Sequence, residues 1–146
     1  GTGALAQALL RKGKFSIEAT DISEEMLKVA GCKKIYQHSF LSDLTKEIPV
    51  ENDIYDGVVS SGTFTHGHVG PSAMVELVRV TKPGGLITIS VNEKHWFALD
   101  FESEIKKLSH YIKNYLLKKI SIYGKQSSHD HKEDKAVILS IKVRKK

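Results

Sequence analysis

The chain has 146 residues, 40% of them hydrophobic, a formal net charge of +5 and a single cysteine. This length is typical of one domain with its own core, and one cysteine excludes an internal disulfide. No apolar run reaches the roughly 18 residues of a membrane-spanning helix, and no charged-then-apolar leader is present. These residues therefore predict a cytoplasmic protein without a membrane partner.

The positive charge is concentrated toward the C-terminus. Residues 1–104 contain 10 Lys and Arg against 14 Asp and Glu, whereas residues 105–146 contain 12 against 3. A basic segment of this kind is a candidate surface for nucleic acid or anionic lipid. Lysines on the solvated side of an amphipathic helix explain the same pattern without any partner, and we favour that explanation.

The chain opens on a glycine turn, Gly1-Thr2-Gly3-Ala4-Leu5-Ala6, followed by apolar residues at helical spacing. Gly1 and Gly3 let the backbone approach a ligand without an intervening side chain. Asp21, 18 residues after Gly3, follows the next apolar run and can accept both hydroxyls of a ribose. The pattern is typical of a βαβ unit that binds an adenosine-containing cofactor, either a dinucleotide or S-adenosylmethionine. An ordinary glycine turn is the alternative.

The first half of the chain alternates between helix and strand. Gly13 and Gly31 are expected to end helices, and Ser23 is expected to cap the second one. The third extended segment leads to Ser42-Asp43-Leu44, so an acidic residue again follows a strand. The expected elements are a helix over residues 3–12, a strand over 15–21, a helix over 23–31 and an extended segment over 34–41.

The second half continues the alternation and ends in two strands. Pro71 suits a helix start, and Lys82-Pro83-Gly84-Gly85 is expected to end that helix. Apolar side chains at 3- and 4-residue spacing then predict a long amphipathic helix, defined by Phe101, Ile105, Leu108, Ile112 and Leu116. The expected strands cover residues 55–61, 86–91, 119–123 and 136–144, with loops over 62–70 and 124–135.

Strands that alternate with helices predict an α/β, Rossmann-like, doubly wound, mostly parallel sheet that binds ligands at the carboxyl ends of its strands. The last two strands have no helix between them, so we expect a C-terminal antiparallel hairpin. This architecture begins with a strand before the glycine turn, and none is present. We therefore expect residues 1–146 to be a single, N-terminally truncated domain with its first strand missing. The sheet should have a gap between the strands that end at Asp21 and Ser61.

Four features occur in an order found in one enzyme family. The first three are Gly-x-Gly at a helix start, Asp21 after one expected strand and Asp43-Leu44 after the next strand. The fourth is the strand Tyr55-Asp56-Gly57-Val58-Val59, which is followed, after a helix, by Lys82-Pro83-Gly84-Gly85. Together they resemble the class I S-adenosylmethionine-dependent methyltransferases. Residues 62–69 and 76–85 look most like the methyltransferase-like proteins of the Williams-Beuren syndrome region. The resemblance implies S-adenosylmethionine as cofactor and an unidentified small-molecule methyl acceptor as partner.

The resemblance also implies roles for individual residues. Gly1 and Gly3 would pass beside the methionine and ribose portions of the cofactor, and Asp21 would hold the ribose hydroxyls. The remaining contacts would be made by Ile22, Asp43 and the backbone of Leu44 with the adenine, and by the backbone of Ser60 and Ser61 near the methionyl amine.

Methyl transfer needs no dedicated base, because alignment of the two reactants supplies much of the rate. If a base takes part, the candidate is His66 or His68, in the loop after the strand over residues 55–61. A zinc site that joins these histidines to His129-Asp130-His131 is disfavoured, because the two groups are far apart in sequence and no Cys pair supports them. We therefore expect no metal.

A NAD(P)-binding oxidoreductase is the nearest alternative, because Gly1-x-Gly3-x-x-Ala6 also fits the dinucleotide pattern. Tyr115 and Lys119 even have the spacing of a short-chain dehydrogenase pair, on the predicted long helix. The second alternative is a catalytically inactive scaffold that binds a partner through its basic C-terminal region. Nucleic-acid methylation is disfavoured, because Ser60-Ser61-Gly62-Thr63 stands where such enzymes commonly have an Asn/Asp-Pro-Pro-aromatic loop.

Overall fold

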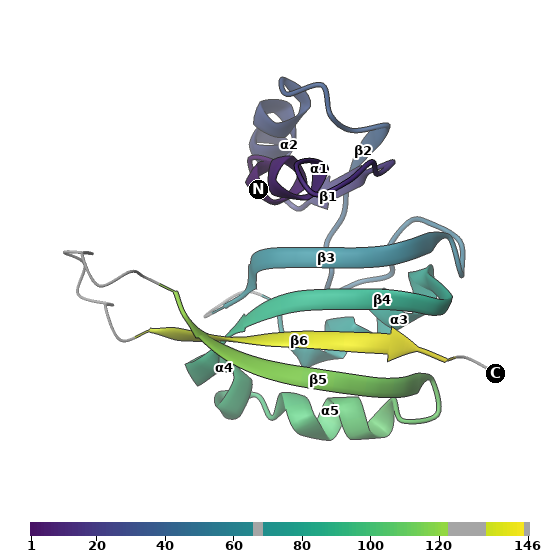
Figure 1. The fold of residues 1–146 in the computed structure, drawn as a ribbon, viewed down its shortest axis with the longest axis vertical. Helices are drawn as coiled ribbons and strands as arrows, with labels where there is room; N and C mark the ends of the chain where they lie inside the picture. Colours follow the sequence, from purple (N-terminus) through teal and green to yellow (C-terminus); the bar gives the residue numbers. More distant parts are fainter. Residues whose placement is uncertain (66–68, 123–133, 145–146) are drawn as a thin grey trace. The chain divides into compact units, whose positions relative to one another are not determined.

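The computed structural model describes residues 1–65, 69–122 and 134–144. The chain divides into two compact units, residues 1–49 and residues 50–146, which we call the first and second unit. Figure 1 shows short helices and strands in the first unit and a sheet of long strands in the second.

Two helices and two parallel strands form the first unit. The elements are α1 (Ala4–Leu10), β1 (Glu18–Asp21), α2 (Glu24–Gly31) and β2 (His38–Leu41). Asp21 is opposite Leu41 in the parallel ladder, so both strands end at the same edge. The predicted cap of α2 is confirmed, because the Ser23 hydroxyl accepts from the Met26 N–H at 3.3 Å.

The extended segment predicted over residues 34–41 is shorter in the structure. Lys34 has a left-handed backbone, with φ 54°, and its N–H donates to the Gly31 carbonyl at 3.1 Å. The turn that ends α2 therefore continues to Lys34, and Ile35 and Tyr36 precede β2 instead of belonging to it.

A four-stranded mixed sheet with short helical segments forms the second unit. Its elements are β3 (Tyr55–Phe64), the 3₁₀ helix η1 (Pro71–Ala73), α3 (Met74–Val80), β4 (Thr81–Asn92), α4 (Glu93–Ala98), α5 (Phe101–Lys107), β5 (Ile112–Ser121) and β6 (Lys135–Val143). The strand order is β3-β4-β6-β5, with β3 parallel to β4 and β6 antiparallel to both of its neighbours. The predicted pairing of the last two strands as an antiparallel hairpin is confirmed.

The core of the second unit lies on one face of this sheet. Ile87 and Ile89 of β4 are buried opposite Ile141 and Leu139 of β6, whereas the alternate residues of both strands are less buried. Burial of one such aliphatic side chain stabilises the fold by about 1.5–3 kcal/mol. Helices α3 and α4 pack against these strands, and α3 contributes the buried residues Met74, Leu77 and Val78.

Residues 82–85 belong to the start of β4. Helix α3 already ends at Val80, and Gly84 has a φ of 81°, which favours glycine. A Cβ on Gly85 would lie 2.9 Å from the Asp56 carbonyl, so the two backbones approach too closely for any side chain. The stretch that is expected to end the helix is thus part of the strand.

The long helix predicted over residues 101–116 is wrong beyond Lys107. Helix α5 ends there, and Ile112 and Leu116 belong to β5, which pairs with β6 along its length. A spacing of four residues fits both a helix and the two-residue repeat of a strand, so the pattern could not distinguish them. A register shift between Ile112 and Asn114 leaves Ile112 buried, whereas Leu116 is 75% exposed.

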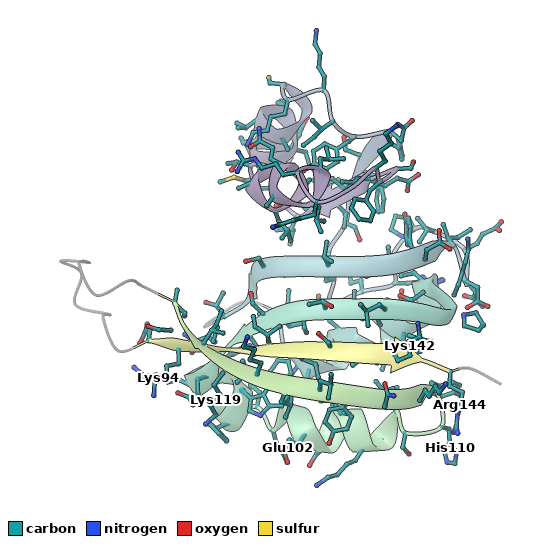
Figure 2. The ribbon with its side chains drawn as sticks, in the orientation of Figure 1. Lys94, Glu102, His110, Lys119, Lys142 and Arg144 are labelled. Atoms are coloured by element: carbon teal, nitrogen blue, oxygen red, sulfur yellow. The ribbon has the colours of Figure 1, made fainter. Side chains whose placement is uncertain are left out.

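The lysines of the predicted helix therefore lie partly on a strand. Those on β5 are Lys113, Lys118 and Lys119. Figure 2 shows Lys119 with Lys94 at one end of the β5–β6 hairpin and His110 with Arg144 at the other. Among the described residues, the basic side chains of the C-terminal part are thus distributed over α5, β5 and β6 and do not form the solvated side of one helix.

Tyr115 and Lys119 do not form a dehydrogenase-like pair on one helical turn. Both belong to β5, where four residues span about 13 Å. Lys119 instead pairs with Glu93 at 2.8 Å and lies 5.4 Å from the centroid of the Phe97 ring.

The two sheets share no ladder among the described residues, and β1 pairs with β2 alone. The missing first strand and the single-domain organisation stay predictions. None of the helices in these parts of the chain combines the length and apolar character that crossing a membrane requires.

Candidate cofactor site

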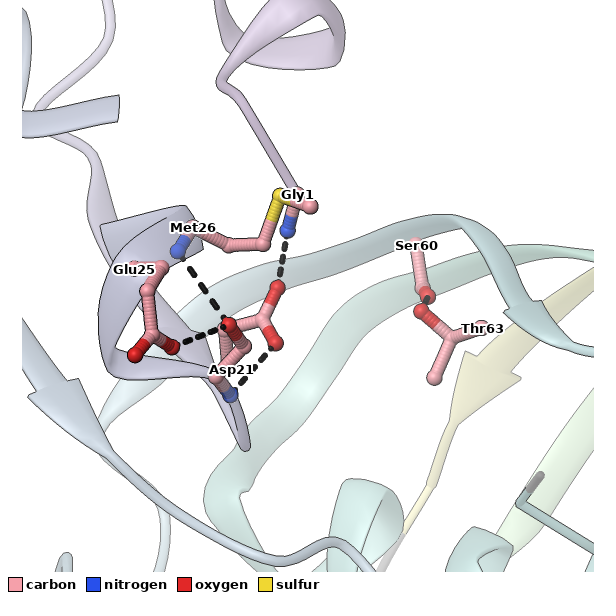
Figure 3. Close-up of polar contacts among 7 residues, drawn as sticks. Gly1, Asp21, Glu25, Met26, Ser60 and Thr63 are labelled. Carbon is pink, nitrogen blue, oxygen red and sulfur yellow. Dashed lines mark hydrogen bonds and ion pairs between the residues drawn. The ribbon is translucent and has the colours of Figure 1, made fainter. Parts of the chain in front are cut away.

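Asp21 lies at the carboxyl end of β1, with its side chain 19% exposed. Its Oδ1 accepts from the Ser23 N–H at 2.9 Å, and its Oδ2 accepts from the Gly1 nitrogen (Figure 3). A carboxylate has about four acceptor positions, so Asp21 keeps acceptor capacity beyond these bonds. The structure therefore brings Gly1 and Asp21 together.

Opposing influences act on the charge of Asp21. Partial burial raises its pKa, but hydrogen bonds from the Gly1 amino group and from the Ser23 and Ile22 N–H groups, together with the charge of that amino group, outweigh it. The pKa is therefore below its usual value. Asp21 is a carboxylate at neutral pH, which is the form that accepts from hydroxyl groups.

The space beside Asp21 suits a ligand with an apolar ring and hydroxyl groups. A Cβ added to Gly1 would meet nothing within 4 Å, so the backbone there is open to approach. Ile22, directly after the acid, is 69% exposed and offers an apolar surface. Both features fit the ribose and adenine portions of S-adenosylmethionine.

Gly3 has a different environment from Gly1. It precedes α1 with a φ of 90°, and a Cβ there would lie 2.9 Å from the Tyr36 hydroxyl and 3.3 Å from Lys33 Cδ. Lys33 in turn donates to Gln7 of α1 at 2.9 Å. Gly3 is thus required by the packing of the turn against the segment after α2, whatever it contributes to a ligand.

Asp43 lies two residues beyond β2, at the edge where Asp21 also lies, because the Ser42 N–H donates to the Asp21 carbonyl at 3.0 Å. Asp43 Oδ1 accepts from the Thr45 hydroxyl at 2.6 Å and from the Thr45 N–H at 2.9 Å. These bonds hold the pKa of Asp43 below its usual value, with a smaller contribution from the charge of Lys46. Asp43 therefore serves a turn, and its Oδ2 lies 3.8 Å from the Lys46 ammonium.

The backbone N–H of Leu44 completes this edge. No described residue accepts from it, so it is available to a ring nitrogen. Its side chain is half-buried.

Two hydroxyls that the sequence analysis did not single out lie next to the acids. Thr20 Oγ1 and Ser42 Oγ are buried and have no hydrogen-bond partner among the described residues. Each belongs to the residue directly before a strand-end acid, which is the signal that could have identified it. Hydroxyl groups without hydrogen-bond partners at the edge where β1 and β2 end fit a polar ligand there.

Ser60 and Ser61 belong to β3 of the second unit. Ser60 is opposite Ile89 and Phe64 is opposite Val91, so β3 has two more residues than β4 between these pairs. The bulge contains Gly62, with a φ of 76°, and the Ser60 hydroxyl donates to the Thr63 hydroxyl at 2.9 Å (Figure 3). Such a bulge takes backbone groups out of the ladder at the carboxyl end of the strand.

The predicted base candidates His66 and His68, and the His129-Asp130-His131 group of the disfavoured zinc site, lie outside the described residues. Within the parts of the chain that the structure describes, no three His, Cys, Asp or Glu side chains are grouped to hold a metal ion.

Several solved structures have this fold. The [4+2]-cyclase SpnF superposes with a TM-score of 0.72 at 14% identity, covering 100% of this chain and 72% of that one. An S-adenosyl-L-methionine-dependent methyltransferase of Methanococcus maripaludis superposes with a TM-score of 0.65 at 22% identity, covering 99% of this chain and 74% of that one. At such identities the likeness shows a Rossmann-like α/β fold and not an activity.

Sequence comparison identifies the family. The malonyl-[acyl-carrier protein] O-methyltransferase of Serratia marcescens is 33% identical over 90 residues, which are 62% of this chain and 34% of that protein. The chain therefore spans about a third of the length of this curated relative. The Methyltransferase domain family matches residues 1–89, a stretch that includes all the predicted cofactor residues. Because this match covers more than half of the chain, the chain belongs to the Methyltransferase domain family, which implies S-adenosylmethionine as its cofactor.

Proposed function

We propose that this chain is the cofactor-binding domain of a methyltransferase that transfers a methyl group to a small-molecule acceptor. The observation that carries the proposal is Asp21. It is a charged, largely buried carboxylate with spare acceptor capacity, at the end of a strand and beside an open glycine backbone. This arrangement is suited to two neighbouring ribose hydroxyls.

The adenine contacts follow from the same edge of the first unit. Ile22 offers the apolar surface for one face of the ring, and the Leu44 N–H is available to the ring edge. Asp43 accepts from the adenine amino group through Oδ2, because Oδ1 is already bonded to Thr45. Gly1 and Gly3 pass beside the ribose and methionine portions.

The backbone of Ser60 and Ser61 meets the methionyl amine. Support comes from the bulge at the carboxyl end of β3, where carbonyl groups that leave the ladder can accept from an ammonium group. The Ser60 side chain is occupied with Thr63, so the backbone is the part of this residue that remains for a ligand.

Bound S-adenosylmethionine would supply an electrophilic methyl group, and an acceptor atom that takes this group would displace S-adenosylhomocysteine. The protein contributes alignment, which is worth up to about 7–11 kcal/mol of the barrier. The acceptor proton goes to water or to a base, for which His66 and His68 stay the candidates.

The acceptor class is open to direct screening. The Serratia marcescens relative is named for oxygen methylation of malonyl-[acyl-carrier protein], so oxygen acceptors belong first in a panel of small molecules. Residues 62–69 and 76–85 resemble the methyltransferase-like proteins of the Williams-Beuren syndrome region. This likeness supports a methyltransferase of that type but does not identify its acceptor.

Calorimetric titration tests the proposal. S-adenosylhomocysteine is expected to bind with micromolar affinity, and reduced NAD, the ligand of the oxidoreductase alternative, is expected not to bind. Binding of reduced NAD alone would overturn the proposal. If neither ligand binds to the folded protein, the inactive scaffold becomes the better explanation.

Replacement of Asp21 by Ala is expected to weaken S-adenosylhomocysteine binding by about 1–3 kcal/mol, because the ribose hydroxyls lose a charged acceptor. The matched control is Glu18→Ala, which removes an acid from the other end of β1 and should leave affinity unchanged. Equal affinity of the Asp21 variant and the original protein would remove Asp21 from the site.

A further inference from the structure

Strand β5 forms a free edge of the sheet in the second unit. It pairs with β6 and with no other described strand, and every residue of the strand after Ile112 is exposed. The edge of a sheet presents N–H and C=O groups to which another extended segment can bond. A strand of this length is therefore a candidate interaction surface, and its side chains indicate the partner that it fits.

The pairing with β6 determines which backbone groups of β5 point away from the sheet. The Ile122 N–H, directly after the strand, donates to the Asp134 carbonyl at 3.1 Å. In an antiparallel ladder such bonds recur at every second residue, so the even-numbered residues from 114 onward bond to β6. The N–H and C=O groups of Tyr115, Leu117 and Lys119 consequently point outward, where no described residue bonds to them.

Apolar side chains occupy the middle of this edge. Tyr115, Leu116 and Leu117 are 39%, 75% and 42% exposed. Tyr115 and Leu117 lie on the face that carries the core, because they are opposite two buried residues of β6. Leu116 lies on the other face, since successive side chains of a strand alternate. A strand added beside β5 would therefore cover apolar surface on both faces.

The charge carried by this edge is positive. Residues 105–122 contain 5 lysines and no acidic residue. Lys119 pairs with Glu93, but no ion pair within the described parts of the chain involves Lys113 or Lys118. These two lysines are on β5, on either side of the apolar residues 115–117. A segment that carries carboxylates would pair with them, whereas a basic segment would be repelled.

The same lysines disfavour a second copy of this chain as the occupant of the edge. Lysines on edge strands are one of the features by which proteins prevent edge-to-edge pairing. Two β5 strands brought together would place like charges along the whole contact. The surface thus combines free backbone groups and apolar side chains with a charge that selects an acidic partner.

We propose that the outer edge of β5 binds an extended, acidic segment of another protein as an added strand. The outward backbone groups supply the pairing, Leu116 and Leu117 the apolar contact, and Lys113 and Lys118 the preference for acidic side chains. The surface is separate from the proposed cofactor contacts of the second unit, because these lie on β3 at the opposite edge of the sheet.

A seven-residue peptide in which glutamate alternates with valine is the probe, since it combines carboxylates with strand-forming apolar residues. The control peptide has lysine in place of each glutamate. Both peptides carry a fluorophore and are titrated with the full chain while the anisotropy is recorded. The acidic peptide is expected to bind and the lysine peptide is expected not to bind.

A pair of variants tests the role of charge. Lys118→Glu is expected to weaken binding of the acidic peptide by about fivefold or more, because an attraction becomes a repulsion. Lys82→Glu makes the same change of charge on β4, two strands away, where its exposed pair with Asp56 contributes little to stability. This control should bind the peptide within about twofold of the original protein.

Hydrogen exchange tests the backbone pairing. Binding of the acidic peptide is expected to slow exchange at the outward amides of Tyr115, Leu117 and Lys119 by about tenfold or more. The amides of Leu116 and Lys118 already bond to β6, so their exchange should change far less. This alternation is specific to an added strand, because a peptide held by side chains alone would leave the outward amides exposed.

The other outcomes overturn the proposal. They are no binding of the acidic peptide to the folded protein, equal binding of the lysine peptide, equal affinity of Lys118→Glu and the original protein, and unchanged exchange at the outward amides. Sedimentation equilibrium of the free protein detects the other occupant. A dimer in which these amides are already protected would show that a second copy covers the edge, which also overturns the proposal.

Discussion

Among the described residues, the first unit buries 3 apolar residues, Ala6, Ala30 and Ile48, whereas the second unit buries 19. The strands of the first unit have 4 residues each, whereas those of the second unit have 9 to 12. Yet the first unit contains Asp21 and Asp43, the charged residues of the proposed cofactor site. Stability and cofactor chemistry are therefore concentrated in different parts of the chain, and each can be perturbed separately.

The largest effect is expected from the sheet core of the second unit. Leu139→Ala empties a fully buried position in β6 and should lower the free energy of unfolding by about 2–5 kcal/mol. Urea unfolding followed by Trp96 fluorescence measures this, because the only tryptophan lies in the same unit. The control Leu116→Ala, on the exposed part of β5, should cost far less. Equal losses would show that β6 is not the centre of the core.

A smaller effect is expected from the glycine turn of the first unit. Gly3→Ala places a side chain at a φ of 90° and against the Tyr36 hydroxyl, at a cost of about 1–2 kcal/mol for the left-handed backbone alone. Hydrogen exchange in residues 1–49 should rise while Trp96 fluorescence is unchanged. Gly31→Ala is the control, because its Cβ would meet nothing within 4 Å. A matching rise in exchange over residues 50–146 would mean that the two units unfold together.

The cap of α2 should contribute less still. Ser23→Ala removes the acceptor of the Met26 N–H and is expected to cost about 1 kcal/mol, seen as faster amide exchange at the start of α2. Ser72→Ala, at an exposed serine of the second unit, provides the comparison. No change at α2 would show that its N-terminus is held by other contacts.

The smallest expected effect is a pH dependence confined to the first unit. The folded pKa of Asp21 lies below its ordinary value of 3.8, so its ionised form stabilises the fold. That contribution is fully present above the ordinary value and is lost as pH falls through the folded value. Asp21→Asn should therefore be less stable than the original protein near neutral pH, and the difference should shrink below pH 3.8, as followed by exchange in residues 1–49. A difference that is constant with pH would contradict this assignment.

Local sequence signals predicted the elements whose ends are fixed by single residues. Ser23 and Gly31 delimit α2, and the β-branched run in residues 86–91 lies within β4. The acids after strands were placed correctly because parallel strands end at a common edge, which puts Asp21 and Asp43 together. These features depend on neighbours in sequence or on strand direction alone.

The larger errors come from contacts that are distant in sequence. Ile112 and Leu116 continue a helical pattern, but pairing with β6 makes them part of a strand. The hydrogen bond between the His95 ring and the Val69 carbonyl links residues 26 apart and has no local signal. The bulge after Ser60 was also missed, although Gly62 within it was visible, because a bulge is defined by the partner strand.

The position of β6 has a consequence for synthesis of the protein on the ribosome. β6 is made after every other described element of the second unit, yet it lies between β4 and β5 in the finished sheet. A nascent chain that has emerged only as far as β5 holds that strand without its partner, since β5 pairs with β6 alone among the described strands. The second unit therefore completes its core only after residues 135–143 leave the exit tunnel, and translation that stops earlier yields an exposed, aggregation-prone edge.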